Sequence, residues 1–587
     1  MQRILIANRG EIAVRIARAC ADAGYVSIAV YADQDFDAMH VRVADEAYAL
    51  GGATPGESYL NIDRLLEIAQ IANADAVHPG YGFLSENANF ARAVEAAGLT
   101  FIGPTPESIE QLGDKVTARQ IASSVGAPLV PGTDRPLADA QEAIAFATEF
   151  GLPVAIKAAF GGGGRGLKVV RRLDEVAAAF DSATREAVTA FGRGECYVER
   201  FLDKPRHVEV QVVGDGQGEV LVVGDRDCSL QRRNQKLVEE APAPNLSDEV
   251  RERIHTAAKK ICAAVNYRGA GTVEFLLAED GTVSFLEVNT RLQVEHPITE
   301  TTSGVDLVRE QFRVAEGQGL SRTQTPVAVG HAFEFRINAE DPGRGFLPSP
   351  GTVEELRVPG GPGVRWDAGV ETGDRVEGAF DSMLGKLVVT GENREVALAR
   401  SRRALRELEV SGFATVLPFH RAVLDHADFI ADQPRVYTQW IETELMPKLE
   451  PGERAKPSTS DALLRLPIEL DGRRVQLGLP AELLSRFSVA AAAPGTVDPR
   501  DAAETSADGA ADTAADTVLS PISGTLVHRL MADGAEVAEG DAIAVCEAMK
   551  MEMPVQADRT GIITWLVDEG APIRVDAPLA RITPAAD

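Results

Sequence analysis

The first thirty residues switch between two hydrophobic periods. Residues 4–7 form a short apolar run, residues 11–23 repeat apolar side chains at helical spacing with Ile12 and Ile16 on one face, and residues 26–31 form a second apolar run. Two short buried runs separated by an amphipathic segment predict a strand, a helix and a strand. This βαβ order is typical of an α/β domain with a parallel sheet.

A second pattern places a glycine-rich loop between two short apolar runs. Residues 153–158 predict a strand that contains Lys157, residues 161–166 read Gly-Gly-Gly-Gly-Arg-Gly, and residues 167–170 predict another strand. A dinucleotide fingerprint requires a helix after the loop, and no Walker-type phosphate motif occurs, so both of those sites are excluded. We interpret the loop as a hairpin whose backbone amides close over phosphates beside Lys157. The alternative is a flexible surface hairpin.

Two further runs predict a hairpin that carries facing acids. Residues 271–277 and 282–289 flank Asp280-Gly281, a strong signal for a two-residue turn. If those two residues form the turn, residue 279 pairs with residue 282, and counting outward places Glu274 opposite Glu287, with Asn289 on the same face as Glu287. Facing carboxylates repel unless one is protonated or a cation bridges them. The pattern therefore predicts an all-oxygen site for Mg²⁺ or Mn²⁺.

The polar alternation continues past this hairpin. If the strand continues, one cleft receives the side chains of Glu287, Asn289, Arg291, Gln293 and Glu295. A later alternating run over residues 330–342 places Glu334, Arg336 and Asn338 on one face. Ordinary half-buried strands alternate as well, but their polar face is usually Lys, Thr and Ser.

The C-terminal region contains two similar β-type units around one lysine. Gly524 and Gly561 each open a short apolar run followed by an Asp-Gly or Glu-Gly turn, which predicts a small all-β domain. Lys550 falls between the units at an expected hairpin tip, flanked by Met549 and Met551. Before this region, residues 464–479 predict a minor hairpin, and residues 490–517 are too rich in Ala, Asp, Thr, Gly and Pro to build a core.

Composition narrows the possible partners. The chain has 587 residues, enough for several domains, and a formal charge of −29, which opposes a nucleic-acid or anionic-membrane surface. Basic residues that bind anionic substrates must therefore be gathered locally. Four cations lie within eleven residues and form either an anion site or a solvated face: Arg226, Arg232, Arg233 and Lys236.

Cysteine usage and the N-terminal sequence indicate a cytoplasmic protein. The five cysteines are widely spaced, and no two of them form a CxxC pair. This spacing favours neither a disulfide framework nor a zinc site. The first apolar run is too short for a signal peptide, and no segment has the length of a membrane span.

Several motifs together resemble biotin carboxylases of the ATP-grasp class. They occupy residues 7–13, 78–87, 113–115, 157–166, 226–229, 287–291, 293–297 and 336–340. Ala548-Met549-Lys550-Met551 resembles the signature of biotinyl domains, in which the central lysine is amide-linked to biotin. In this order the chain resembles the α subunit of a bacterial acyl-CoA carboxylase.

The resemblance implies an α/β chain with five parts. These are a biotin carboxylase N-terminal domain (1–112), an ATP-grasp domain (113–328), a biotin carboxylase C-terminal domain (329–447), a short middle region with an acidic flexible linker (448–517) and an all-β biotinyl carrier domain (518–585).

The resemblance also implies a role for each matching residue. Bicarbonate would be held by Lys236, Arg291, Gln293 and Val294, with Glu295 as its base and with Arg291 and Arg336 stabilising the biotin enolate. Mg²⁺ or Mn²⁺ would be held by Glu274, Glu287 and Asn289, and biotin would be attached to Lys550. ATP would be bound by Lys115, Lys157, Gly163, Gly164, Glu199, Arg200, Phe201, Leu202, His207 and Asn234, although many relatives have His in place of Asn234.

Three functional hypotheses follow from the resemblance. In the first, carboxylated biotin passes to a separate carboxyltransferase β subunit that acts on an acyl-CoA, because nothing in the chain resembles a CoA or keto-acid site. The second assigns the same half-reaction to a pyruvate-type carboxylase, and the third is a biotinylated scaffold with an inactive ATP site. The resemblance further implies a biotin protein ligase as a partner and a homo-oligomer within a larger complex.

Overall fold

The computed structural model describes residues 1–583 except residues 134, 159–166, 192–193, 447–448, 451–462, 471–472, 481–515, 523, 549–550 and 574–576. Gly163, Gly164, Lys550 and most of the expected acidic linker therefore lie outside the described residues. Within the described part, no helix combines the length and apolar character that a membrane crossing requires.

The N-terminal region forms a five-stranded parallel sheet in the order β3-β2-β1-β4-β5. Its strands are β1 (Arg3–Ile6), β2 (Val26–Tyr31), β3 (Glu46–Ala49), β4 (Ala76–His78) and β5 (Thr100–Phe101), and its helices include α1 (Gly10–Ala23), α3 (Ile62–Ile71), α4 (Ala88–Ala96) and α5 (Pro106–Gly113). The predicted βαβ opening is confirmed as β1, α1 and β2. The loop of residues 79–87 leaves the carboxyl end of β4, where ligands tend to bind in α/β sheets.

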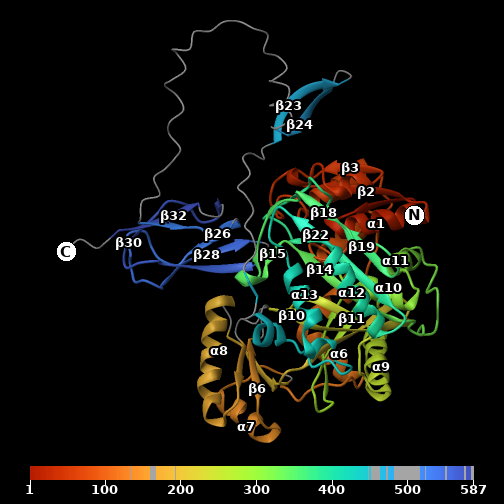
Figure 1. Cartoon of the computed structure of the whole chain (residues 1–587). Coiled ribbons are helices and arrows are strands. Elements are labelled where there is room, and N and C mark those ends of the chain that lie inside the picture. Colours follow the sequence, from red (N-terminus) through yellow and green to blue (C-terminus); the bar gives the residue numbers. More distant parts are fainter. Residues whose placement is uncertain are drawn as a thin grey trace.

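A single eight-stranded antiparallel sheet joins strands of residues 206–289 to strands of residues 331–391 (Figure 1). Its order is β13-β12-β9-β10-β11-β14-β21-β19. The strands are β9 (Arg206–Asp215), β10 (Val220–Arg232), β11 (Gln235–Ala241), β12 (Arg268–Leu277), β13 (Val283–Asn289), β14 (His331–Asn338), β19 (Val364–Ala368) and β21 (Met383–Gly391). Pairing of β11 with β14 makes the sheet continuous.

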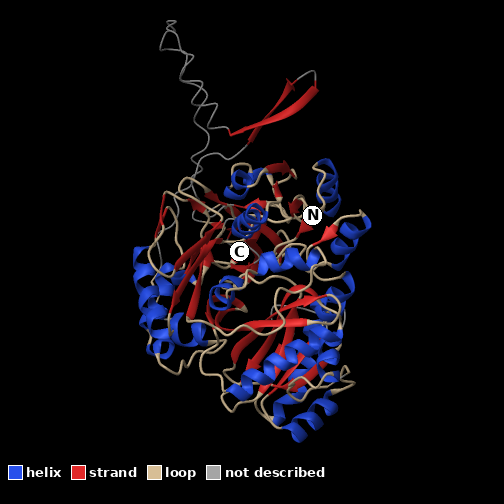
Figure 2. Cartoon of the chain, turned by 90° about the vertical axis from the view of Figure 1, so that its right-hand side faces the viewer, coloured by secondary structure: helices blue, strands red, loops and turns tan. Residues whose placement is uncertain are grey.

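Helices pack against this sheet, and Figure 2 shows helices along the outside of the molecule. They include α6 (Lys115–Ser124), α9 (Asp248–Ala264), α10 (His296–Ser303), α11 (Leu307–Ala315), α12 (Arg394–Glu407) and α13 (Leu417–Asp425). Ile254, Ala258 and Ile261 of α9 belong to one buried cluster with Val208 and Val210 of β9. The helical spacing of these apolar residues thus places one face of α9 on the sheet.

The strands on either side of the glycine-rich segment belong to a small separate sheet in the order β7-β6-β8. Its strands are β6 (Val154–Ala158), β7 (Leu167–Val170) and β8 (Cys196–Arg200), and it packs against α7 (Ala140–Phe150) and α8 (Val176–Phe191). The antiparallel pairing of β6 with β7 confirms the two predicted strands, and the glycines between them lie outside the described residues.

The hairpin of β12 and β13 confirms one prediction and corrects two. Glu274 does face Glu287, but the predicted pairing of residues 279 and 282 is wrong, because the last pair is Leu277↔Val283. A β-bulge between Phe275↔Phe285 and Glu274↔Glu287 then shifts the register by one residue and restores the expected pairing. The strand also ends at Asn289 instead of continuing to Glu295.

The C-terminal domain consists of two four-stranded sheets, in the orders β25-β32-β30-β27 and β29-β28-β26-β31. Its strands are β25 (Thr517–Leu519), β26 (Gly524–Arg529), β27 (Glu536–Val537), β28 (Ala542–Ala548), β29 (Met551–Gln556), β30 (Gly561–Trp565), β31 (Pro572–Ile573) and β32 (Pro578–Thr583). This arrangement confirms the predicted all-β domain. Strands β28 and β29 pair as far as Ala548↔Met551, so Lys550 belongs to the two-residue connection between them.

Two short hairpins lie outside the large sheet. One precedes the C-terminal domain in sequence, and the other contacts that domain. Strands β23 (Leu463–Leu470) and β24 (Arg473–Pro480) confirm the predicted minor hairpin and stand apart from the main body in Figure 1. Strands β15 (Glu340–Asp341) and β16 (Leu347–Pro348) follow β14, and Leu347 packs against the core of the C-terminal domain.

Candidate active site

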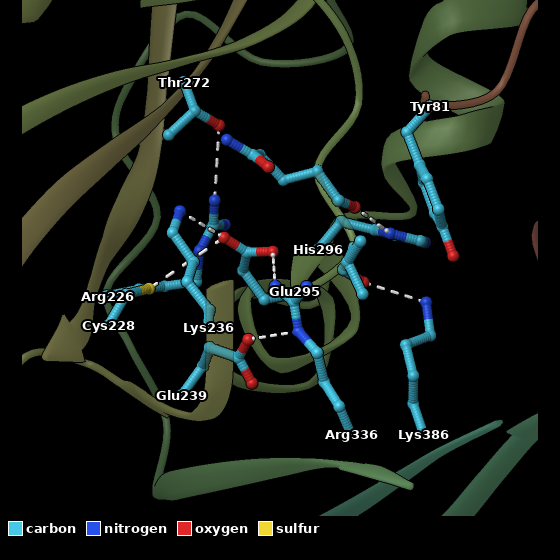
Figure 3. A network of polar contacts seen from close by, with 12 residues as sticks. Tyr81, Arg226, Cys228, Lys236, Glu239, Thr272, Glu295, His296, Arg336 and Lys386 are labelled. Carbon is cyan, nitrogen blue, oxygen red and sulfur yellow. Dashed lines mark hydrogen bonds and ion pairs between the residues drawn. The ribbon is translucent and has the colours of Figure 1, made fainter. Parts of the chain in front are cut away.

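Buried charged side chains from several strands of the large sheet, together with Glu295 from the segment after β13, meet at Lys236 (Figure 3). The Lys236 ammonium lies 2.5 Å from Glu209 Oε2, 2.9 Å from Glu274 Oε1 and 2.7 Å from Glu295 Oε1. Burial opposes this charge, but the three carboxylates outweigh it and hold the pKa of Lys236 well above its usual value. The ammonium is therefore charged although it is almost fully buried.

Glu295 is fully buried and is held by two cations. Besides the contact with Lys236, its Oε2 accepts a hydrogen bond of 2.9 Å from Arg336 Nη2. Burial raises the pKa of Glu295, but Lys236, Arg336 and Arg226 outweigh it and lower the pKa well below its usual value. The carboxylate is thus ionised and able to accept a proton.

Glu274 is the carboxylate on which several predicted site residues converge. Its Oε1 accepts hydrogen bonds from Lys236 Nζ (2.9 Å), Asn289 Nδ2 (2.7 Å) and Gln293 Nε2 (3.1 Å). Its Oε2 lies 2.9 Å from His207 Nε2. Burial raises the pKa of Glu274, but Lys236 and His207 outweigh it and lower the pKa.

The segment after β13 carries the remaining predicted anion ligands. Arg291 donates hydrogen bonds to Gln293 Oε1 (3.0 Å) and to Asn289 Oδ1 (3.2 Å). Glu86, from the loop after β4, accepts hydrogen bonds from the Thr290 backbone amide (3.1 Å) and from Arg291 Nε (2.7 Å). These contacts replace the backbone hydrogen bonds that the expected strand would have made. They still bring Arg291, Gln293 and Glu295 close together.

The chemistry of the residues suits the predicted divalent cation. Glu274 and Glu287 face each other, and Asn289 ends the same strand, so two carboxylates and an amide supply only oxygen ligands. Glu287 is 37% exposed and lies 3.6 Å from Lys115 Nζ, so its oxygens are accessible at the mouth of the site.

The predicted nucleotide residues occupy a second part of the site. Lys157 and Glu199 form an ion pair across β6 and β8. The backbone amides of Arg200 and Phe201 donate hydrogen bonds to Pro131 O and Pro153 O, both 2.9 Å, and so anchor the chain that leaves β8. Leu202, in the segment that follows β8, is buried. The Lys115 side chain, in contrast, is 71% exposed.

Asn234 lies in the exposed turn between β10 and β11 and not in the buried cluster. Arg232 pairs with Gln235, and the two residues between them, Arg233 and Asn234, have φ values of +48° and +65°. A two-residue turn with positive φ at both positions favours Asn. The turn itself therefore explains why Asn is tolerated at this position.

Sequence reasoning missed several charged residues of the cluster. Glu209 shares the parity of His207 on β9, a signal that could have found it, whereas Glu239 and Lys386 are recognised only from their contacts. Arg226, one of the four cations predicted as an anion site or a solvated face, is fully buried, so the solvated face is wrong for this residue. Arg226 binds Glu209 Oε1 at 2.5 Å, and Glu239 Oε1 accepts a hydrogen bond of 2.6 Å from Arg336 Nε. Burial raises the pKa of Glu239 to about 7, against the opposing effect of Arg336.

Protein-family models match four successive parts of the chain. They are described as the biotin carboxylase N-terminal domain (residues 1–109), the carbamoyl-phosphate synthase L chain ATP binding domain (114–323), the biotin carboxylase C-terminal domain (334–443) and the biotin-requiring enzyme domain (516–582). The biotin-dependent acyl-coenzyme A carboxylase alpha3 subunit of Mycobacterium leprae is 55% identical over 595 residues, which cover 99% of this chain and 98% of that protein.

The chain belongs to the family of biotin-dependent acyl-coenzyme A carboxylase α subunits. It is a biotin carboxylase fused to a biotin carrier domain, as the motifs predict. A pyruvate carboxylase subunit of Methanothermobacter thermautotrophicus is 48% identical over 73% of this chain and 87% of its own length.

A solved structure resembles the carboxylase part of this family member. The biotin carboxylase domain dimer of Hydrogenobacter thermophilus 2-oxoglutarate carboxylase, in complex with MgADP, ADP and bicarbonate, has a TM-score of 0.70 and 44% identity. The match covers 75% of this chain and 97% of that one.

Proposed function

We propose that the chain uses ATP and bicarbonate to carboxylate biotin on Lys550 of its own carrier domain. The observation that carries this proposal is the buried Lys236 ammonium, which holds the ionised Glu295 directly beside Arg336. Such a cluster provides cations for a small anion and a base for its proton in one water-poor place. The relative with bound MgADP and bicarbonate supports the same substrates.

Glu295 becomes a better base when bicarbonate binds. In this structure Lys236 and Arg336 lower its proton affinity, and an anion held by Lys236 and Arg291 would compete with Glu295 for Lys236. Weaker contacts to Glu295 raise its pKa toward that needed for general-base catalysis. Deprotonated bicarbonate would then attack the γ-phosphate of ATP to give carboxyphosphate.

The nucleotide would lie between the small sheet of β6 to β8 and the large sheet. Lys115, Lys157 and His207 would contact phosphates, with Gly163 and Gly164 closing over them and with Glu199 to Leu202 and Asn234 near the rest of ATP. Glu274, Glu287 and Asn289 would hold the divalent cation. When bound, that cation spreads the charge of the transferring phosphoryl group.

The carboxylated carrier would supply a separate carboxyltransferase β subunit that acts on an acyl-CoA of the acetyl or propionyl class. Similarity to the Mycobacterium leprae protein over almost the whole chain supports this acceptor. Similarity to a pyruvate carboxylase subunit keeps a pyruvate-type acceptor as the second candidate. Lys550 would be biotinylated by a biotin protein ligase, and the chains would associate in a cytoplasmic complex.

Bicarbonate-dependent ATP hydrolysis, stimulated by free biotin, tests the proposed half-reaction. We expect Glu295→Gln to lower carboxylation of both free and carrier-bound biotin by about 100-fold or more, because the base is lost. Lys550→Arg should retain carboxylation of free biotin and lose only transfer through the carrier. A wild-type chain without bicarbonate-dependent hydrolysis would instead indicate a scaffold with an inactive ATP site.

The acceptor is tested by streptavidin capture of the native chain followed by mass spectrometry. Biotin on the Lys550 peptide and a co-captured acyl-CoA carboxyltransferase are expected. Capture of a keto-acid carboxyltransferase would favour the pyruvate-type candidate, and an unmodified Lys550 would contradict the carrier assignment.

A further inference from the structure

Lys386 is a fully buried cation that lies beside the predicted site without belonging to it (Figure 3). Its ammonium donates a hydrogen bond of 2.8 Å to the backbone oxygen of Val294. It lies 3.1 Å from Glu11 Oε1 and 5.9 Å from the centroid of the Tyr81 ring. One charged group therefore contacts the segment that carries the bicarbonate residues and two elements of the N-terminal sheet.

The three contacts come from parts of the chain that are far apart in sequence. Lys386 lies on β21, opposite Arg336 of β14 and Asp367 of β19. Glu11 opens α1, and Tyr81, from the loop after β4, donates a hydrogen bond to the same Glu11 oxygen. The start of α1 closely approaches the end of β19, the strand that pairs with β21, since a Cβ on Gly369 would lie 2.5 Å from the Glu11 backbone nitrogen.

The segment from Thr290 to Glu295 depends on side-chain contacts for its conformation. Because β13 ends at Asn289, this segment has no strand pairing. Glu86 holds its beginning, and His296 Nδ1 lies 2.8 Å from the Gln293 backbone oxygen. The contact of Lys386 with Val294 holds the peptide unit that joins Val294 to Glu295.

Stabilisation of the fold by the ion pair with Glu11 is a weak explanation for this buried ammonium. Desolvation of a buried ion pair offsets most of its Coulombic attraction, so a pair with Glu11 alone adds little net stability. A charge-assisted hydrogen bond to a backbone oxygen, in contrast, fixes the position of that peptide unit.

We propose that Lys386 is a positioning residue that holds the Val294 peptide, and through it Gln293 and Glu295, in the geometry that binds bicarbonate. This inference rests on the proposed function. Lys386 contacts no reacting atom and acts through Val294. It also makes the bicarbonate segment dependent on the docking of α1 against β21.

Lys386→Met tests the inference in the full-length biotinylated chain. We expect the KM for bicarbonate to rise about tenfold or more, because a hydrogen bond from a charged group is lost, while the KM for ATP changes less than about twofold. Lys260→Met, an exposed lysine on α9, is the matched control and should change neither constant.

A second variant tests whether the effect of Lys386→Met reflects misfolding. Burial already raises the pKa of Glu11 to about 7 although Lys386 opposes it, so Lys386→Met alone leaves an unpaired buried carboxyl. Glu11→Gln/Lys386→Met removes both charges, which is less destabilising than removing one partner. The double variant still lacks the contact with Val294 and should retain the raised KM for bicarbonate.

The outcomes distinguish the inference from the proposed function. A selective rise in the KM for bicarbonate in the folded variants supports the positioning role. An unchanged KM for bicarbonate, or an equal rise in both constants, overturns it. If the wild-type chain shows no bicarbonate-dependent hydrolysis, the proposed function itself fails.

Discussion

At the scale of single residues, Glu274 contacts residues of three predicted sites, those for bicarbonate (Lys236 and Gln293), the divalent cation (Asn289) and ATP (His207). One of its oxygens accepts hydrogen bonds from Lys236, Asn289 and Gln293, which is one more than its two lone pairs favour. A metal ion bound to that oxygen would compete with the Lys236 ammonium. We therefore expect metal loading and the release of Lys236 toward bicarbonate to be linked.

Glu340 allows a test of electrostatics at the same scale. It is buried on β15, and burial raises its pKa from 4.5 to about 7, although Ser382 and Asn338 donate hydrogen bonds to it. A carboxyl group whose pKa is raised by folding contributes stability below its unfolded pKa, and this contribution is lost as pH rises from about 4.5 to about 7.

Glu340→Gln should remove this pH dependence. At pH 8 the variant should be more stable than the wild-type chain by up to about 3 kcal/mol, and at pH 4 the two should be similar. Thermal unfolding across this pH range provides the measurement. A stability difference that does not change with pH would contradict the predicted titration.

At the scale of elements, capping decides how a cation can open a helix. Lys115 is the first residue of α6, where the helix dipole disfavours a positive charge. Asp114 precedes it as the N-cap, and its Oδ1 accepts hydrogen bonds from the Thr117 amide (2.8 Å) and hydroxyl (2.7 Å). The cap satisfies an amide that lacks a helical partner and places a negative charge beside Lys115.

Asp114→Ala should destabilise the first turn of α6 by about 1 kcal/mol and raise the KM for ATP. Faster hydrogen exchange of the Thr117 amide would report the loss of the cap. Asp114→Asn keeps a capping oxygen and is the matched control, so it should exchange nearly as slowly as the wild-type chain. Equal exchange rates in all three proteins would show that the cap does not hold the helix start.

At the scale of the whole molecule, the β15–β16 hairpin connects the strand that carries Arg336 with the carrier domain. It directly follows β14, which carries Arg336, and its Leu347 packs against the carrier core. Figure 1 shows β15 beside β26 and β28 of the carrier domain. A small apolar contact suits the proposed function, in which the carrier leaves to reach a second active site.

Leu347→Glu should weaken the contact between the β15–β16 hairpin and the carrier domain without affecting the carboxylation reaction itself. We expect carboxylation of the attached carrier to fall several-fold, because a charge replaces the apolar contact, while carboxylation of free biotin stays unchanged. Ile71→Glu, at an exposed apolar residue of α3, is the control and should alter neither rate. Equal losses with both substrates would mean that Leu347 supports the site itself.

The sequence alone determined which secondary-structure elements form and which residue types are available for the site. Periodicity predicted the βαβ opening, the glycine-loop hairpin, the facing pair Glu274 and Glu287 and the all-β C-terminal domain, because each depends on contacts between residues close in sequence. The motifs also gave the family and the candidate ligands of the site.

Only the tertiary structure decided how these pieces meet. It joined β11 to β14 in one sheet, ended β13 at Asn289, and brought Glu209, Glu239 and Lys386 to the cluster. Such contacts join residues tens to hundreds of positions apart, and a buried charge is stable only where partners from other strands surround it. No local pattern records that condition, so the supporting charges of the site became visible only in the folded chain.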